Sequence, residues 1–223
     1  MAFRKFFGRR DNAGGGTRFA ADWLIVGLGN PGEKHVRDRH NAGFWVINDL
    51  AKRAATQPKM TGSMMAIGLG TLAGARVALV KPKTFMNASG KAVRQAQQWA
   101  NCGSDRTVIV YDDLDLGVGA LRIRWGEGGT GGHNGIKSIV NSVGGDFIKV
   151  RIGIGRPLAG GEPTWAPEEI AAYVLGAPHG EDRRIMDETA RLAADAIETI
   201  IREGPEMAGN RYNRKEPAKA GAR

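Results

Sequence analysis

The sequence WLIVGLGNPG, residues 23–32, is a short apolar run that stops at Asn-Pro-Gly. An apolar run of this length, closed by such a turn signal, is typical of a β-strand buried inside a sheet. The chain continues with NAGFWVINDLAKRAA, residues 41–55, in which apolar side chains recur at helical spacing. We therefore expect a buried strand, a turn, and a helix that lays one apolar stripe on the core.

The rest of the chain continues this alternation of strands and helices. Two strands about a glycine-rich turn are predicted within residues 63–82, and further strands within 106–116, 119–125 and 147–157, the last of the chain. Helices are predicted within residues 87–102, 136–143 and 180–203, with a linker over 160–169. Strands that mostly alternate with helices favour an α/β fold of three layers, with functional side chains at strand ends and in loops.

Length and composition favour one large domain. The chain has 223 residues, of which 42% are hydrophobic, and can bury a substantial core. Cys102 is the only cysteine, so the chain has no internal disulfide and too few thiols for a cysteine-built zinc site. No uncharged apolar run approaches the roughly 20 residues of a membrane span, and the first residues lack the apolar block of a secretory signal. We expect a soluble, cytoplasmic protein without membrane contact.

The net charge of +9 is concentrated at the two ends of the chain. Residues 1–20 and residues 211–223 each carry +4, which leaves +1 for residues 21–210. We expect a basic flexible arm over 1–20, one folded domain over 21–210 and a basic tail over 211–223. Inside the domain, residues 122–156 carry six bases against two acids, which indicates either a surface for nucleic acid or ordinary solvated charge.

Two glycine-rich stretches do not fit a nucleotide site. GLGNPG, residues 27–32, follows a strand, but Pro31 interrupts the helix start that a dinucleotide fingerprint needs. GEGGTGGHNG, residues 126–135, lacks the Lys-Ser or Lys-Thr pair of a phosphate-binding Walker loop. The second stretch is therefore either a tight turn or a loop whose closely approaching backbone presents His133 and Asn134.

Polar side chains at strand ends and at a helix start predict a catalytic crevice. Asn30 follows the first strand, Asp112 ends the strand within 106–116, and His40 lies where the first helix begins. Such positions meet at one edge of an α/β sheet. A histidine alone at a helix start would indicate a cap or a surface residue, but an imidazole held by a carboxylate is a general base near neutral pH. Because no Ser or Cys occupies a nucleophile elbow, water is the expected nucleophile.

Several motifs, in this order and spacing, resemble those of the bacterial-type peptidyl-tRNA hydrolase family. They are GLGNPG, RHNAGF, KPKTFMNASGKAV, YDDLDL, GGTGGHNGIKSI and VRIGIGRP, and the resemblance runs from about Trp23 to about Asn213. It implies a single globular α/β/α domain with a central mixed sheet. It also implies an enzyme that cleaves the ester between a peptide and the terminal ribose of tRNA, with no metal or cofactor. We expect a monomer whose partner is peptidyl-tRNA.

The resemblance also implies roles for individual residues. His40 would be the catalytic base, Asp112 the group that holds its basic form, and Asn30 the group that distinguishes a blocked from a free amino acid. Substrate would be bound by Asn87 and Asn134, the crevice would be lined by Phe85 and Met86, and tRNA phosphates would meet Arg122, Arg124, Lys137, Lys149 and Arg151.

This chain departs from the usual family pattern at two positions near His40. His35 stands where a tyrosine is usual, and it is expected either to contact substrate as an aromatic ring would or to be exposed. Asp38 stands where a threonine is usual. Its carboxylate is expected either to raise the pKa of His40 slightly or to cap the following helix.

Two other functions fit parts of the sequence. A relative that keeps the fold but has lost turnover would be an RNA-binding factor and would lack the histidine or an asparagine of the crevice. Here all five crevice residues are present, namely Asn30, His40, Asn87, Asp112 and Asn134. A peptidase of similar architecture would generally need a metal or a protein nucleophile, and it would leave the basic residues of 122–156 without a role.

Overall fold

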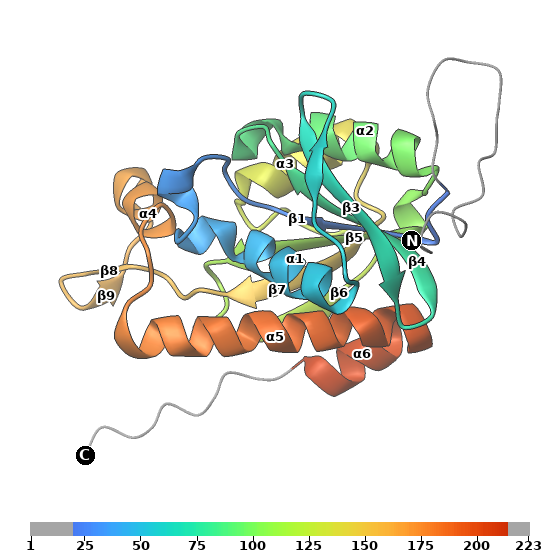
Figure 1. Cartoon of the computed structure of the whole chain (residues 1–223). Coiled ribbons are helices and arrows are strands. Elements are labelled where there is room, and N and C mark those ends of the chain that lie inside the picture. Colours follow the sequence, from blue (N-terminus) through green and yellow to red (C-terminus); the bar gives the residue numbers. More distant parts are fainter. Residues whose placement is uncertain (1–19, 214–223) are drawn as a thin grey trace.

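A central mixed sheet lies between two layers of helices in the computed structural model, which describes residues 20–213 (Figure 1). Its strands are β1 (Trp23–Gly27), β2 (Lys59–Thr61), β3 (Met65–Leu72), β4 (Ala75–Pro82), β5 (Thr107–Asp113), β6 (Leu121–Arg124) and β7 (Ile148–Gly153). The main helices are α1 (Ala42–Arg53), α2 (Ser89–Ala100), α3 (Asn134–Val143), α4 (Pro167–Val174), α5 (Gly180–Glu203) and α6 (Pro205–Tyr212). The expected three-layer α/β fold is confirmed.

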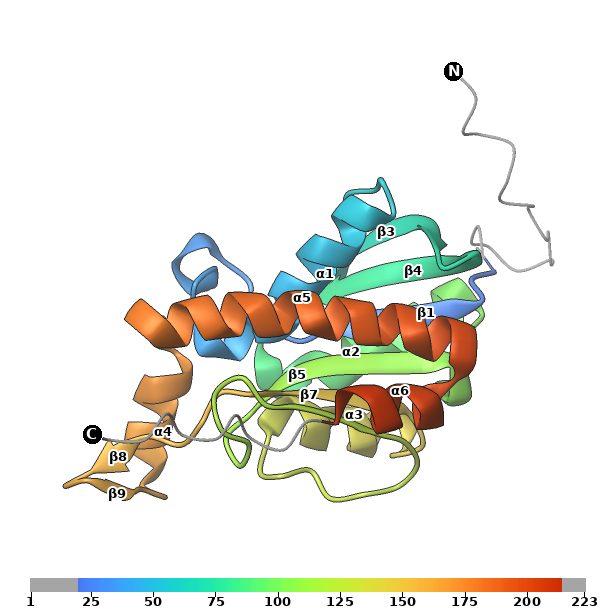
Figure 2. The same ribbon diagram turned by 90° about the horizontal axis from the view of Figure 1, so that it is seen from below.

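The first strand is apolar throughout because the sheet is covered on both faces. Along β1, Trp23 and Ile25 belong to one core with α1 and α5, whereas Leu24 and Val26 belong to a second core with α2 and α3. Figure 2 shows α5 and α6 running across one face of the sheet and α3 on the other. A strand buried on both faces has no polar alternation, which is the pattern of residues 23–27.

The strand order places several loops at one edge of the sheet. The order is β2-β3-β4-β1-β5-β7-β6, and β4, β1, β5 and β7 run parallel, while the β2–β3, β3–β4 and β6–β7 pairs are antiparallel. The chain passes from β1 to β4 on one side and then returns to β5 on the other side. A crevice forms at the carboxyl edge where the strand order reverses in this way.

Glycine lets the first helix approach this edge closely. A side-chain carbon added at Gly43 would lie 2.4 Å from both the Leu28 backbone nitrogen and the Val110 carbonyl oxygen. The start of α1 therefore packs directly on the backbone of β1 and β5. This close approach brings the residues just before α1 over the end of β5.

The structure corrects the sequence prediction at its shortest elements. The strand within 147–157 is not the last, because β8 (Leu158–Ala159) and β9 (Glu162–Pro163) form a small hairpin after it. The expected linker over 160–169 contains β9 and the first turn of α4, and β2 and α6 were not predicted. Strands of two or three residues carry no measurable periodicity.

The ends of the chain add two points. The expected arm over residues 1–20 and tail over 211–223 lie almost wholly outside the described residues. Among the residues that are described, α6 continues to Tyr212, and no helix is long and apolar enough to cross a membrane.

Candidate active site

The loop that carries His40 is fixed by its neighbours on both sides. A single 3-10 turn, Arg39–Asn41, leads directly into α1. Arg39 is buried, and its guanidinium donates to the carbonyls of Gly176 (3.2 Å) and Ala177 (3.1 Å), just after α4. The cation therefore binds the negative end of α4 and ties this helix to the turn that carries His40.

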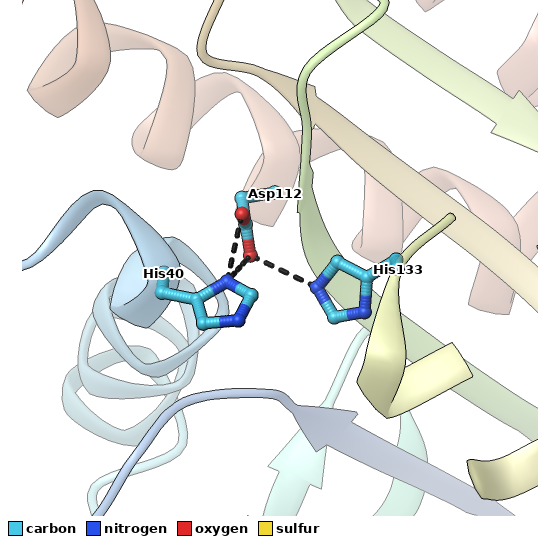
Figure 3. A group of neighbouring side chains, drawn as sticks. All are labelled: His40, Asp112 and His133. Atoms are coloured by element: carbon cyan, nitrogen blue, oxygen red, sulfur yellow. Dashed lines mark hydrogen bonds and ion pairs between the residues drawn. The ribbon is translucent and has the colours of Figure 1, made fainter. Parts of the chain in front are cut away.

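His40 and Asp112 meet at the end of β5 (Figure 3). Nδ1 of His40 lies 2.9 Å from both oxygens of the Asp112 carboxylate. The Asp112 side chain is 2% exposed and that of His40 12% exposed. With Nδ1 donating to the carboxylate, the other ring nitrogen, Nε2, is left without a hydrogen bond among the described residues.

A second histidine bonds the same carboxylate from the opposite side (Figure 3). Nε2 of His133 lies 3.1 Å from Oδ1 of Asp112. Nδ1 of His133 accepts from the backbone N–H groups of Gly135 (3.1 Å) and Ile136 (3.2 Å) at the start of α3. Because Nδ1 is an acceptor, the neutral ring carries its proton on Nε2 and donates it to Asp112. His133 therefore links the cap of α3 to the carboxylate of Asp112.

The charges of this cluster stabilise one another. Burial raises the pKa of the Asp112 carboxyl, but the two imidazoles outweigh burial and hold that pKa well below its usual range. Burial lowers the pKa of His40, but the charges of Asp112 and, more weakly, Asp38 raise it, so the pKa lies above the ordinary 6.5. Asp112 is therefore ionised at neutral pH, and its negative charge stabilises the protonated form of His40.

The side-chain amide of Asn30 has one half bonded within the protein and one half free. Its Oδ1 accepts from the Met86 backbone N–H at 3.0 Å, and its backbone N–H and C=O bond the side chain of Asn41 at 2.8 and 3.0 Å. These bonds fix the orientation of the amide. The Nδ2 donor has no partner among the described residues and is the group that Asn30 can offer to a ligand.

A cavity of about 600 Å³, the catalytic pocket, connects these groups. Its polar wall comprises Asn30, His40, Asn87, Asp112, Asp113, His133, Asn134 and Arg156, and its apolar wall includes Phe85, Leu114, Trp165, Ile170, Val174 and Leu175. The polar wall combines a histidine base with amide donors, and the apolar wall is built largely on α4. Such a cavity suits the hydrolysis of an acyl group that carries apolar substituents.

Comparison with known proteins assigns this architecture. The sequence model of one family, peptidyl-tRNA hydrolase, matches residues 24–220. The chain belongs to the peptidyl-tRNA hydrolase family. The family member from Roseiflexus sp. strain RS-1 is 43% identical over 197 residues, or 87% of each chain, and that from Geobacillus kaustophilus is 42% identical over 180 residues, or 80% of this chain and 92% of the relative. The crystal structure of peptidyl-tRNA hydrolase from Acinetobacter baumannii superposes with a TM-score of 0.80 at 33% identity, over 89% of this chain and 98% of that one.

The residues that resemblance to peptidyl-tRNA hydrolases assigned to the crevice lie together in the structure. Phe85 is 68% exposed at the mouth of the catalytic pocket, and Asn87 and Asn134 are exposed in its wall. Met86 is buried beneath them and donates its N–H to Asn30. From the sequence, His133 is predicted only as a polar group of the glycine loop, and its bond to Asp112 is not predicted. The sequence signal that could have indicated a role for His133 is its position directly before Asn134, a predicted substrate-binding residue.

His35 does not line the catalytic pocket. Its Nδ1 lies 2.6 Å from Oδ2 of Asp38, and the two side chains are 15% and 6% exposed. Asp38 makes no side-chain bond to the helix start, so the expected cap is absent, whereas the expected rise in the pKa of His40 is found. A contact of His35 with substrate stays a prediction.

The basic strip comprises Arg122, Arg124, Lys149 and Arg151 on β6 and β7, at the edge of the sheet, together with Lys137 on α3. Arg122 is paired with Arg151 and Arg124 with Lys149 in the antiparallel register, so these side chains point to one face. Lys149 is buried, however, and its Nζ donates to the carbonyls of Gly126 (2.6 Å) and Gly145 (2.9 Å). Arg151 donates to Asp113 at 2.5 Å. These two cations therefore support the strip from within.

Three bases of the strip have no such partner. Arg124 and Lys137 are exposed and Arg122 is half-buried. Within residues 20–213, no carboxylate lies within 4.0 Å of any of them, in contrast to Arg151. They are the cations of the strip that a phosphate can reach.

One cluster in the described part of the chain offers three ligand atoms to a metal. It is His40, Asp112 and His133, whose ligand atoms lie within 4.8 Å of one another. Both ring nitrogens already donate protons to the carboxylate between them. A cation would have to displace both protons, so the arrangement favours hydrogen bonding over coordination.

Proposed function

We propose that this chain hydrolyses the ester bond of peptidyl-tRNA with a water that His40 activates. The observation that carries the proposal is the hydrogen bonding of His40 Nδ1 to both carboxylate oxygens of Asp112. It leaves Nε2 of His40 as the proton acceptor in the catalytic pocket. In this account Nε2 takes a proton from water as the water attacks the ester carbonyl. The same proton then passes to the leaving ribose oxygen, which releases free tRNA and the peptide acid.

Amide groups would orient the substrate without ionising. The Nδ2 donor of Asn30 can bond a carbonyl oxygen, and Asn87 and Asn134 offer further amides in the same wall. A free ammonium at the substrate's amino end finds no carboxylate among these three side chains. We infer that a blocked, neutral amino acid is therefore preferred over a free one.

The unpaired cations Arg122, Arg124 and Lys137 would bind tRNA phosphates. Arg151 and Lys149 would support that surface from beneath. We further infer a cytoplasmic monomer that recycles tRNA from interrupted translation, since ribosomes produce the substrate. Sedimentation of the purified chain at micromolar concentration tests the oligomeric state.

The hydrolysis of N-acetyl-aminoacyl-tRNA and of free aminoacyl-tRNA by the purified full chain tests this function. We expect the blocked substrate to be cleaved at least about tenfold faster, because a free ammonium left without a carboxylate partner in the pocket would cost that factor or more. A His40→Ala preparation made in the same way controls for a contaminating hydrolase. The proposal is overturned if the purified chain cleaves neither substrate. It is also overturned if the His40→Ala preparation cleaves the substrates as fast as the parent chain does.

A further inference from the structure

A second hollow lies on the other side of Asn30 from the catalytic pocket. This lysine cleft has a volume of about 290 Å³ and lies between the turn after β1, the start of α1 and the end of β4. Asn30 lines both hollows. Asn41, the residue that follows His40 in the sequence, lines the lysine cleft and is hydrogen-bonded to Asn30. The two hollows therefore adjoin at Asn30, whose backbone is bonded by the side chain of Asn41.

The cleft contains two cations without an anion. Lys81 is half-buried and Lys83 is exposed, and both line the cleft. Within residues 20–213, no carboxylate lies within 4.0 Å of either ammonium, although the exposed Glu33 also belongs to the lining. Nζ of Lys81 instead donates to Oδ1 of Asn48. Burial, and then the charge of Lys83, lower the pKa of Lys81 to about 8.

Two aromatic residues, Phe44 and Trp45, also line the cleft. The Lys81 ammonium lies 5.4 Å from the ring centroid of Phe44. Trp45 donates its indole N–H to the Val36 carbonyl at 2.9 Å, which fixes the turn over the cleft. A hollow with unpaired lysines, an amide and aromatic rings is suited to the sugar phosphate of a nucleotide, with the rings available to its base.

We propose that the lysine cleft binds the phosphates of the single-stranded 3′ end of tRNA. The inference rests on the proposed function, because the ester at His40 would be carried by the terminal nucleotide of tRNA and the lysine cleft adjoins the catalytic pocket at Asn30. A phosphate there supplies the anion that Lys81 lacks and offsets the cost of its partial burial. The cleft would thus fix the nucleotide side of the ester, while the catalytic pocket takes the acyl side.

Binding of the unacylated trinucleotide CCA, measured by calorimetry apart from any turnover, tests the proposal. In the double variant Lys81→Met/Lys83→Met we expect the affinity for CCA to fall about tenfold or more, since two charge-assisted contacts are lost. The affinity for adenosine, which has no phosphate, should stay unchanged. The control Lys52→Met/Lys59→Met removes two exposed lysines outside the cleft and should bind CCA as the parent does.

The outcomes separate this proposal from the hydrolase function. Unchanged CCA affinity in the cleft variant overturns the cleft, whatever the chain hydrolyses. An equal loss for adenosine and CCA, or an equal loss in the control, also overturns it, since the first indicates a distorted site and the second diffuse attraction. Loss of CCA binding alone supports the cleft even where no ester is cleaved. Lys81→Arg, which keeps the charge, should retain most of the affinity if the double variant folds poorly.

Discussion

The catalytic pocket and the basic strip hold their charges in opposite ways. In the pocket, the buried carboxylate of Asp112 is bonded by two imidazoles. On the strip, Arg122, Arg124 and Lys137 have no carboxylate within 4.0 Å in the described part of the chain. Charges that are already paired in the free protein are preorganised for the reaction, whereas unpaired surface cations form their ion pairs only when the substrate binds. Variants of the first region should therefore change kcat, and variants of the second should change KM.

The largest effect is expected at the base. His40→Ala should lower kcat by about 10²- to 10⁴-fold, because Nε2 of His40 is the one imidazole nitrogen of the described cluster that is free to take a proton from water. The affinity for tRNA, measured by fluorescence titration, should stay within about twofold. A variant that kept more than about a tenth of the parent rate would show that the base lies elsewhere.

His133 tests whether the carboxylate must be held from both sides. In His133→Ala we expect kcat to fall about tenfold with little change in KM, since one neutral hydrogen bond is worth about that factor. The negative charge of Asp112 would then act on His40 alone, so the acid limb of the pH profile should move to higher pH. His133→Asn, which keeps an amide donor, should recover part of the rate. Loss of the helix cap alone would lower thermal stability without moving the pH profile.

Asn30 tests the discrimination between acyl groups. Asn30→Asp keeps an oxygen for the Met86 N–H and replaces the free Nδ2 donor by a carboxylate oxygen. The ratio of rates for N-acetyl-aminoacyl-tRNA and free aminoacyl-tRNA should then fall by about tenfold, because the new charge attracts ammonium. Asn30→Ser serves as an uncharged control. An unchanged ratio in the aspartate variant would remove Asn30 from the account of specificity.

The smallest effect on the chemistry is expected on the strip. Arg124→Gln/Lys137→Gln should raise KM on the order of tenfold at constant kcat and lower the salt slope of tRNA binding by about two, one for each phosphate contact. The matched change Arg184→Gln/Arg202→Gln on the acidic helix α5 should alter neither quantity. A fall in kcat at constant KM would break the division between the two regions.

The sequence predicted those helices and strands best in which the apolar pattern extends over many residues. The apolar run of β1, the stripe of α1 and the 24 residues of α5 each cover enough turns or buried positions to define their element. The hairpin β8–β9 could not be predicted, since two-residue strands leave too few positions for a period, and α4 begins inside the glycine- and proline-rich stretch 160–169 that predicts a linker. Yet α4 supplies a large part of the apolar wall of the catalytic pocket, through Ile170 and Val174.

The site was predicted as far as strand ends and helix starts allow. His40, Asp112 and Asn30 were placed at one sheet edge from element boundaries alone. The bond from His133 to Asp112 depends on how α3 approaches β5 in space, and no spacing along the chain encodes it. The internal partners of Lys149 and Arg151 were hidden for the same reason, because charge counts do not distinguish a free cation from one bonded to carbonyls or to Asp113.

The pH dependence of kcat/KM tests the central claim, that Asp112 makes His40 the base. The rate requires neutral His40, so it should fall as pH drops through a pKa above the ordinary histidine value of 6.5. In Asp112→Asn the same limb should move to lower pH, because the amide no longer favours the charged ring. A rate that does not vary between about pH 5 and 8, or a limb that stays in place in Asp112→Asn, would contradict the account.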